Sequence, residues 1–476
     1  SRDGEMTFRY VYQYLNCTQP CFRLWISSLT DESVRQGMEN LKPDSCYDSL
    51  FLAADSRNKA DWILGINASY AMCKATGLGN NSLGRVQTPV LAARRYRERE
   101  NHISSDSWPI YISLQKDGIL FKMRRTQDLP DKESATMFFQ DCKLARQAQI
   151  TGISHSIKEI LPPDLLDLTQ LQKEANIRYG YTASEVYDIA QSLYEKKLIS
   201  YPRTSSRYLT EDVFDSLSPI MARLLSWELF PAAKGTGGID ISSLSRHVIS
   251  AEKANVHHAI IITGIRPGNL SEKEMQVYRL VAGRMLEVFM APCRIETTNV
   301  EAVCAAQHFK AEQTRIIEAG WHDVFMHSDM VPKSGYSVNE LPEVKKGDNL
   351  NVCGCNMVHK KELPVDPFTD AELVEYMELN GLGTVSSRTN IIRTLVNRKY
   401  IRYSGKYIVP TPKGIFTYET IRGKKIADTS LTADWEKQLA GLESGMITGQ
   451  DFLNRIRTLA KEMTDDIFNT YSTKEE

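Results

Sequence analysis

Two β-rich stretches that lie far apart in the chain constrain its fold more than any other feature. Asp106–Leu161 has alternating apolar and polar residues with a Lys116-Asp117-Gly118 turn signal, and Cys293–His359 is similar, with glycines as breaks. Such alternation is typical of strands in a sheet. The sequence between them is helical instead. We therefore expect one β-domain built from two chain segments, with a helical domain inserted between them.

The helical segment carries a clear start signal. Thr182 and Glu185 have the spacing of a capping box, in which a hydroxyl and a carboxylate satisfy free N–H groups at a helix start. One apolar helix face follows: Val186, Ile189, Ala190, Leu193 and Tyr194. This pattern predicts a helix that ends near Lys197.

The C-terminal part has the same local pattern, followed by a hairpin. Thr369 and Glu372 form a second capping box, Gly381-Leu382-Gly383 ends that helix, and a further helix runs through Ile391–Val396. Strands at 400–403 and 406–409, joined by a Ser-Gly turn, complete the pattern. Two helices followed by a hairpin predict a winged-helix-like unit.

The total charge hides a strongly basic stretch. With 58 Lys and Arg against 59 Asp and Glu, a net charge of -1 would argue against a nucleic-acid partner. Ten basic residues nevertheless fall between Arg388 and Lys425, opposed only by Glu419, and include Arg393. Tyr400, Tyr403, Tyr407 and Phe416 lie among them and could stack on bases. We expect this stretch to bind a polyanion. A second group, Arg94, Arg95, Arg97 and Arg99, is offset by acids, and a solvated helix face explains it equally well.

Several classes of protein are disfavoured. No stretch approaches the ~18 consecutive apolar residues of a membrane span, and no secretory signal is visible. The nine cysteines are scattered without zinc-ribbon spacing, which favours reduced thiols in a cytoplasmic protein.

Ser200–Ser206 holds the candidate nucleophile. Pro202 forces Tyr201 into extended backbone, where residues i and i+2 point the same way, so Arg203 is aimed alongside Tyr201. A guanidinium beside a phenol can favour the phenolate and hold a phosphate, and the hydroxyls of Thr204 and Ser206 could contact phosphate oxygens. By spacing alone, a surface turn in which Tyr201 packs and Arg203 pairs with an acid is the more common arrangement.

His257 and His258 form the second candidate element, just before the apolar run Ala259–Ile262. One imidazole could donate to a phosphate oxygen or act in proton transfer. A strand end with one ring buried and satisfied is the alternative. Metal binding is less favoured, because adjacent strand residues face opposite ways.

Together these motifs resemble the type IA DNA topoisomerases, in particular bacterial topoisomerase III, over essentially the whole chain. Six motifs carry the resemblance and occur in the family's order. The first combines Ser1–Glu5, the end of an acidic Toprim motif, with the following stretches Leu24–Thr30 and Ala60–Asn67. The other five are Leu83–Pro89, Tyr201–Thr204, His257–Ile261, Gly381–Thr384 and Trp435-Glu436.

The resemblance implies a mixed α and β, multidomain, toroidal core with helical winged-helix-like domains and a β-rich gate domain. It implies that residues 1–45 are a remnant of the Toprim domain and that residues 46–105 are the first part of the helical gate domain. Residues 106–160 and 294–362 would form the β-rich hinge domain, and residues 161–293 between them the helical cap domain with the active-site tyrosine. Residues 363–476 would form the C-terminal helical, winged-helix-like gate domain. We expect a monomer.

The resemblance also implies residue roles. Tyr201 would attack a phosphodiester of single-stranded DNA and keep the 5′-phosphate, without ATP, so that another strand can pass through the gap. Arg203 and His257 would contact the scissile phosphate and its neighbour, and Arg85 and Gln87 would hold the strand backbone. The activity would relax negatively supercoiled DNA or decatenate it.

The sequence departs from the family pattern where metal is bound. Asp3 stands where Glu is usual, and the other acidic groups that serve Mg²⁺ would lie before Ser1. We therefore expect this chain alone to bind single-stranded DNA but to cleave and reseal it poorly or not at all. Ser205 also stands where the family usually has Asp or Asn, and Ile262 stands where it usually has Pro. A non-catalytic single-stranded-DNA-binding module is the alternative; a tyrosine recombinase or a relaxase fits the motif positions poorly.

Overall fold

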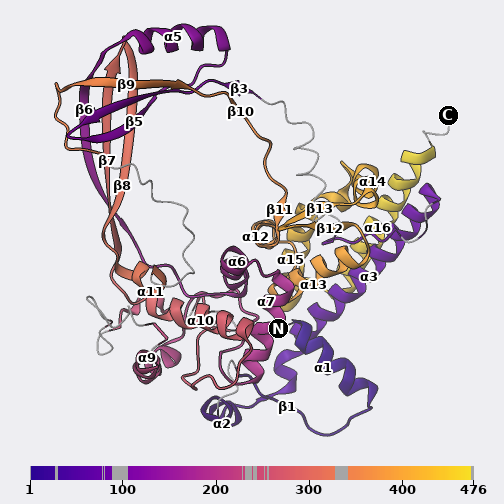
Figure 1. Ribbon diagram of the computed structural model, residues 1–476. Coiled ribbons are helices and arrows are strands. Elements are labelled where there is room, and N and C mark those ends of the chain that lie inside the picture. The colour runs from indigo at the N-terminus through magenta and orange to yellow at the C-terminus, as the bar shows by residue number, and fades with distance from the viewer. Residues whose placement is uncertain are drawn as a thin grey trace.

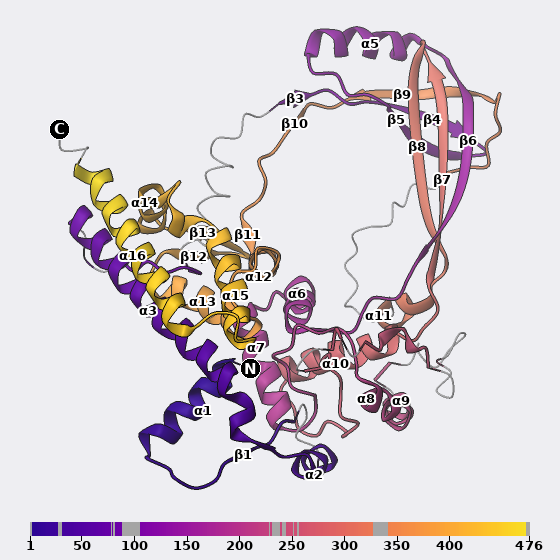
Figure 2. The ribbon, with the colours of Figure 1, turned by 180° about the vertical axis from the view of Figure 1, so that it is seen from behind.

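The computed structural model describes residues 2–26, 31–77, 79, 81–87, 105–227, 229–230, 239, 244–250, 252–254, 257–326 and 341–472, apart from the side chains of 32, 33, 386 and 470–472. The elements are arranged as a ring (Figures 1 and 2). Helices form one side, and a β-barrel lies at the opposite side, connected to the helices by long strands. The expected mixed, multidomain, toroidal architecture is confirmed.

The barrel draws its strands from both predicted β-rich stretches. Its order is β4-β5-β8-β7-β6-β9, so strands on both sides of the helical insertion close one sheet. Helix α5 (Lys132–Leu144) packs on it, and a small ladder of β3 (Asp106–Ser107) and β10 (Lys360–Lys361) lies beside it. The barrel strands are β4 Ile110–Lys116, β5 Ile119–Arg125, β6 Gln147–Ile160, β7 Cys293–Cys304, β8 Gln307–Glu318 and β9 Asn349–Met357.

The helical insertion, which we call the cap (residues 161–293), has its own apolar core. The capping box of Thr182 and Glu185 is confirmed, with both reciprocal hydrogen bonds present. The cap helices are α6 Leu168–Tyr179, α7 Ala183–Glu195, α8 Glu211–Asp215, α9 Leu217–Ser226, η4 Arg246–Val248 and α10 Glu272–Glu287. Short helices η5 (Gly320–His322) and α11 (Asp323–Met326) pack against α10.

The predicted winged-helix-like unit is present; we call it the winged unit. It contains β11 Phe368–Thr369, α12 Asp370–Leu379, α13 Val385–Asn397, β12 Ile401–Ser404 and β13 Tyr407–Pro410, with sheet order β11-β13-β12. The Thr369–Glu372 capping box is confirmed. Gly381 and Gly383 have φ of 63° and 72°, a left-handed conformation that ends α12 and that favours glycine.

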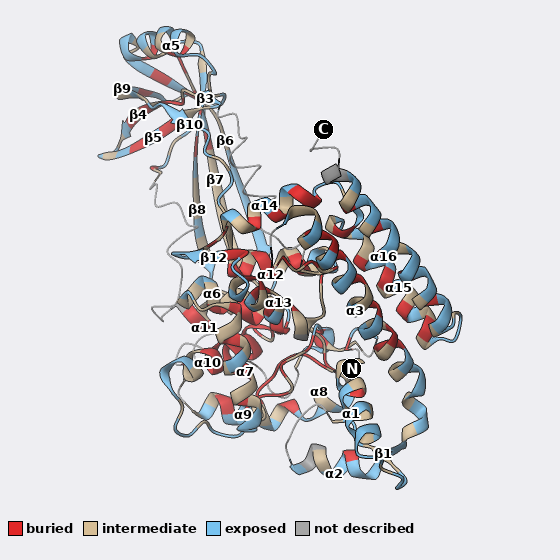
Figure 3. Cartoon of the chain, turned by 90° about the vertical axis from the view of Figure 1, so that its right-hand side faces the viewer, coloured by how far each residue is buried: buried red, intermediate tan, exposed pale blue. Residues whose placement is uncertain are grey.

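A helix from the first part of the chain packs with the two last helices in a bundle. Helix α3 (Asp48–Thr76) lies beside α16 (Gly449–Ser472) and α15 (Ser430–Glu443), around Trp435 and Phe452 (Figure 1). Helix α14 (Pro412–Ile421) and η6 (Lys425–Ala427) connect the winged unit to α15. Buried residues are concentrated in the helical side of the ring, around α10, α12 and α13 (Figure 3).

Residues 2–47 form what we call the N-terminal unit: α1 Arg2–Tyr14, β1 Phe22–Arg23, α2 Asp31–Glu39, β2 Lys42–Pro43 and η1 Asp44–Tyr47. In this unit Phe22 and Arg23 pair with Pro43 and Lys42 in a short antiparallel ladder. A bilayer-spanning helix, both long enough and apolar enough, does not occur in the described part of the chain.

Candidate active site

The two catalytic motifs predicted from sequence meet because the extended segments that carry them pair. The backbone N–H of Ser200 donates to Ile261 O at 2.8 Å. The hydroxyl of Ser200 donates to Ala259 O at 3.1 Å and accepts from Ile261 N at 3.0 Å. Ser200 is only 2% exposed, so these bonds are shielded from water. The pairing places Tyr201 next to His257, although more than fifty residues separate them in sequence.

Helix α7 supplies the surroundings of the tyrosine. Tyr187, Gln191 and Tyr194 are spaced i, i+4, i+7 and therefore share one face of α7. The ring of Tyr194 meets that of Tyr201 edge-on, with centroids 5.4 Å apart. Gln191 and Tyr187 contact Arg203 instead. One helix face thus contacts both Tyr201 and Arg203.

Arg203 lies beside the tyrosine as the extended backbone predicts. Its guanidinium carbon is 5.9 Å from the ring centroid of Tyr201 and 5.2 Å from that of Tyr187. Nη2 donates to Gln191 Oε1 at 2.9 Å, while Nε is buried without a hydrogen-bond partner. A buried donor without a partner is costly, so a phosphate oxygen that reached Nε would satisfy it.

The tyrosine is held as a neutral phenol. Burial raises the pKa of Tyr201 above its ordinary value, and the positive charge of Arg203 opposes this without outweighing it. The sequence-based idea that the guanidinium favours the phenolate is correct in sign, but desolvation is the larger effect. The phenolate of Tyr201 is therefore a minor species at neutral pH.

The two adjacent histidines face opposite ways. The ring of His257 lies 4.5 Å from the ring of Tyr201 between centroids, and its Nδ1 is buried without a partner. Burial lowers the pKa of His257 to about 4, so the imidazole is neutral at pH 7. His258 is 7% exposed and its Nδ1 contacts Ala259 O at 2.7 Å. His257 therefore faces Tyr201, and His258 is a buried ring with a hydrogen-bond partner.

The hydroxyls of Thr204 and Ser206 have partners within the protein. Thr204 Oγ1 donates to His257 O at 2.9 Å, and Ser206 Oγ donates to Lys253 O at 2.7 Å. Both residues are almost fully buried. In this arrangement they tie the segment after Tyr201 to the histidine segment. Contact of these hydroxyls with DNA stays a prediction.

A groove of about 640 Å³ holds Arg85 and Gln87, the two residues expected to bind the DNA backbone. Its walls come from α3, the segment Ser82–Gln87 and the start of α13. Arg57 and Arg398 also line it, together with the exposed ring of Trp62. Asp3 lies in its wall, and the negative charge of Asp3 contributes to the raised pKa of Tyr201.

Within the groove, Arg85 is 5% exposed. Its Nε pairs with Asp61 Oδ1 at 3.0 Å, its guanidinium lies 4.6 Å from the Trp435 ring centroid, and its Nη1 is buried without a partner. Gln87 Oε1 accepts from Arg398 Nη1 at 3.0 Å. The orientation of both residues is therefore set by the protein before any ligand binds.

Arg388 and Arg393 lie at the contact between the winged unit and the cap. Arg388 is 8% exposed, and its Nη1 donates to Thr169 Oγ1 at 3.2 Å and pairs with Glu378 at 3.3 Å. Arg393 is exposed and pairs with Asp188 of α7 at 2.9 Å. Both are thus engaged in protein contacts, and their binding of DNA stays a prediction.

The basic excess of Arg388–Lys425 is smaller in the structure than in the sequence. Acids from elsewhere in the chain pair with several of these cations: Glu378 with Arg388, Asp188 with Arg393, Asp466 with Lys424 and Glu462 with Lys425. Tyr400 is 1% exposed and donates its hydroxyl to Ser82 O, so it cannot stack on a base as suggested. The Arg94–Arg99 group lies outside the described residues.

Asp3 is the residue of this chain that is expected to be a remnant of the acidic metal-binding motif. The carboxylate of Asp3 is paired with Arg57. No three His, Cys, Asp or Glu side chains of the described ranges are arranged to hold a metal ion.

Three residues at or near the site were not chosen from the sequence, although two of them lie in motifs that carry the family resemblance. Trp25 stacks on His257, and Trp62 and Arg57 line the groove. Trp25 and Trp62 lie within the stretches Leu24–Thr30 and Ala60–Asn67, so the aromatic residues of these stretches were the available signal.

Comparison with known proteins agrees with this geometry. A family model described as DNA topoisomerase matches residues 45–454. The chain is 32% identical to DNA topoisomerase 3 of Bacillus licheniformis over 495 residues, covering 98% of this chain and 67% of that protein. It is 31% identical to DNA topoisomerase 3 of Bacillus subtilis, covering 99% and 68%. Among solved structures, full-length topoisomerase I from Thermotoga maritima has the same fold, with a TM-score of 0.76 and 22% identity over 98% of this chain and 76% of that one. The chain therefore belongs to the DNA topoisomerase family, as a type IA, topoisomerase III-like member.

Proposed function

We propose that Tyr201 makes a transient break in single-stranded DNA by attacking a phosphodiester. A bond forms between the phenolic oxygen and phosphorus while the bond from phosphorus to the 3′ oxygen breaks. The phenolic proton ends on the released 3′ oxygen, and the 5′-phosphate stays on the tyrosine. Reversal restores the strand, and because the ester conserves the bond energy no ATP is needed. The observation that supports this proposal most directly is the packing of Tyr201 against Arg203 and His257.

Each neighbour has a distinct task in this reaction. Arg203 presents a buried Nε without a partner, suited to a phosphate oxygen and to the charge that develops in the transition state. His257 is neutral, so it contacts phosphate as a hydrogen-bonding group rather than as a cation. The groove with Arg85, Gln87 and Arg398 would hold the strand on its way to Tyr201.

Passage of a second strand would require the cap to separate from the winged unit. Their contact contains polar links: Gln172 donates to Thr389 Oγ1 at 2.9 Å, the N–H of Ala183 donates to Asp370 at 2.8 Å, and Lys173 pairs with Glu375 at 2.7 Å. Polar contacts of this kind can re-form with water when two domains separate, which suits a reversible gate. Relaxation of supercoils or decatenation would follow. The weak activity expected of this chain alone, and a monomeric state, stay predictions.

The test is a denaturing gel with single-stranded DNA labelled at its 3′ end, because the 5′-phosphate side would stay on the protein. The unaltered chain with Mg²⁺ should give a faint labelled protein band, in line with the weak activity expected of this chain alone, and Tyr201→Phe should abolish that band. Tyr194→Phe is the matched control, because it keeps the ring contact and should keep the band. A band that survives in Tyr201→Phe would refute this nucleophile. DNA binding without any band would leave the chain a single-stranded-DNA-binding module.

A further inference from the structure

A row of aromatic rings crosses from the N-terminal unit to the nucleophile. Tyr47 and Trp25 stack almost parallel, with centroids 6.0 Å apart and 5° between planes. Trp25 in turn stacks on His257 at 5.9 Å and 16°, and His257 packs on Tyr201 at 4.5 Å. Trp25 belongs to the N-terminal unit, whereas His257 and Tyr201 belong to the cap. The stack therefore joins two separate parts of the chain at the active site.

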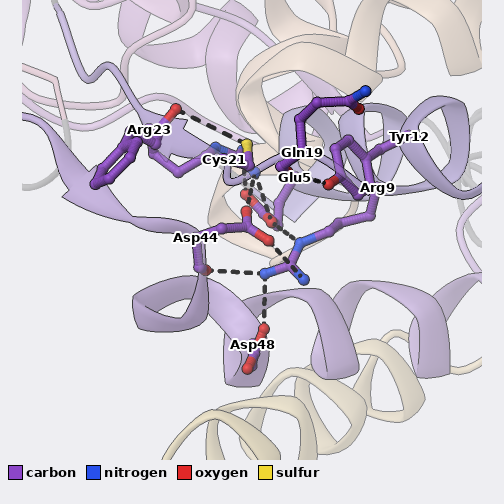
Figure 4. A network of polar contacts seen from close by, with 9 residues as sticks. Glu5, Arg9, Tyr12, Gln19, Cys21, Arg23, Asp44 and Asp48 are labelled. Carbon is purple, nitrogen blue, oxygen red and sulfur yellow. Dashed lines mark hydrogen bonds and ion pairs between the residues drawn. The ribbon is translucent and has the colours of Figure 1, made fainter. Parts of the chain in front are cut away.

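An ion network fixes the outer end of this row (Figure 4). The guanidinium of Arg23 lies 5.5 Å from the ring centroid of Tyr47. Arg23 pairs with Glu5 at 2.5 Å and with Asp44 at 2.9 Å, and Glu5 also accepts from Arg9 at 2.9 Å. Glu5 is only 3% exposed, so its ion pairs are strongly held. Trp25 thus lies two residues after Arg23, which these ion pairs hold in place.

Nothing comparable anchors the imidazole of His257. Its Nδ1 is buried without a partner, and no hydrogen bond to its side chain is found within the described ranges. Stacking contacts are therefore what orient the ring: Trp25 from the N-terminal unit and Tyr201 from the cap. Offset or parallel packing of aromatic rings is favourable and directional, so losing one neighbour frees the ring to rotate and to hydrate.

We propose that Trp25 is a positioning residue for DNA cleavage, which holds the His257 imidazole against Tyr201 from across the contact between the N-terminal unit and the cap. The inference rests on the proposed function. Because the ring comes from another part of the chain, the catalytic pair is complete only while the two parts are in contact. Cleavage and resealing are thereby confined to the arrangement in which the N-terminal unit is in contact with the cap.

The activity test compares three variants in the gel assay for the covalent adduct. Trp25→Ala should slow adduct formation about 10-fold to 100-fold, as expected for loss of orientation of a catalytic group. Trp25→Phe keeps a stacking ring and should restore most of the rate. Trp108→Ala is the matched control, since it removes a tryptophan that stacks on His359 at 4.4 Å beside the barrel. An unchanged rate in Trp25→Ala would overturn the proposal.

A second measurement does not depend on activity. Diethyl pyrocarbonate acylates accessible neutral imidazoles, and peptide mass spectrometry can follow its reaction with His257 in the complete chain. Trp25→Ala should speed the labelling of His257, whereas Trp108→Ala should speed only that of His359. Equal rates of His257 labelling in the unaltered chain, Trp25→Ala and Trp108→Ala would overturn the proposal. If Tyr201→Phe kept the adduct, the proposed nucleophile would fail; if only Trp25→Ala behaved like the unaltered chain, the positioning role alone would fail.

Discussion

The planes of the Tyr201 and His257 rings meet at 44°, with 4.5 Å between centroids. This contact joins a neutral phenol to a neutral imidazole beside the guanidinium of Arg203. Burial accounts for both protonation states, because it disfavours the phenolate of the tyrosine and the imidazolium of the histidine. The site is therefore arranged for charge that appears only during the reaction.

Arg203 should stabilise the transition state of cleavage. Arg203→Ala should slow single-turnover adduct formation about 100-fold to 1000-fold, the usual cost of removing one donor to a developing charge. Arg203→Lys should recover only part of this, because an ammonium cannot keep the Gln191 bond while reaching the phosphate. Arg246→Ala, an exposed cap arginine paired with Glu211, should leave the rate unchanged. Equal rates in Arg203→Ala and Arg246→Ala would contradict this role.

The rate of cleavage should rise with pH through the neutral range. The pKa of Tyr201 is raised, so the reactive phenolate stays a minor species, and each pH unit below that pKa increases it about 10-fold. Adduct formation measured from pH 7 to 9 should therefore climb without a plateau. In Arg203→Ala the rise should move to higher pH, since Arg203 lowers the pKa of the phenol. A plateau beginning near pH 7 would show that the phenol is already largely ionised at neutral pH, which would contradict the raised pKa.

Arg388 and Arg393 should differ in their effect on stability. Arg388→Met leaves Glu378 and Thr169 without their partner in a buried contact and should cost about 2–4 kcal/mol in the free energy of unfolding. Arg393→Met removes an exposed ion pair and should cost less than about 1 kcal/mol. Urea unfolding followed by circular dichroism measures both. Similar losses for the two variants would mean that Arg388 is not the structural residue of the pair.

Arg398 should contact a DNA phosphate in the groove. Arg398→Ala should weaken binding of single-stranded DNA and reduce the slope of log Kd against log salt by about 0.7, the value for one phosphate contact. Fluorescence anisotropy at several salt concentrations gives the slope. Arg315→Ala, an exposed arginine of β8 paired with Glu296, serves as the control. A slope unchanged by Arg398→Ala would place the strand elsewhere.

Local sequence signals gave reliable predictions. The capping boxes at Thr182 and Thr369 start α7 and α12 as expected, because their hydrogen bonds are formed within four residues. The period-2 stretches form a single barrel, since an alternating segment must bury one face against another. The extended backbone that Pro202 imposes places Arg203 beside Tyr201.

Long-range contacts could not be read from the same signals. The burial of Tyr400 depends on Ser82, more than three hundred residues away, and the pairing of Arg393 depends on Asp188 in the cap. A count of charges along the chain cannot include acids that approach only after folding. The stack of Trp25 on His257 is of this kind, because neither residue's neighbours in sequence indicate the other.

The identity of the residue that carries the DNA tests the central claim most directly. The adduct can be trapped with single-stranded DNA, digested with nuclease and trypsin, and analysed by mass spectrometry. Trypsin places Tyr201 in the peptide Leu198–Arg203, and Tyr187 and Tyr194 in a separate peptide that ends at Lys196. The account predicts a nucleotide joined through its 5′-phosphate to Tyr201 in the peptide Leu198–Arg203. A nucleotide found on Tyr187 or Tyr194, or on any other residue, would contradict it.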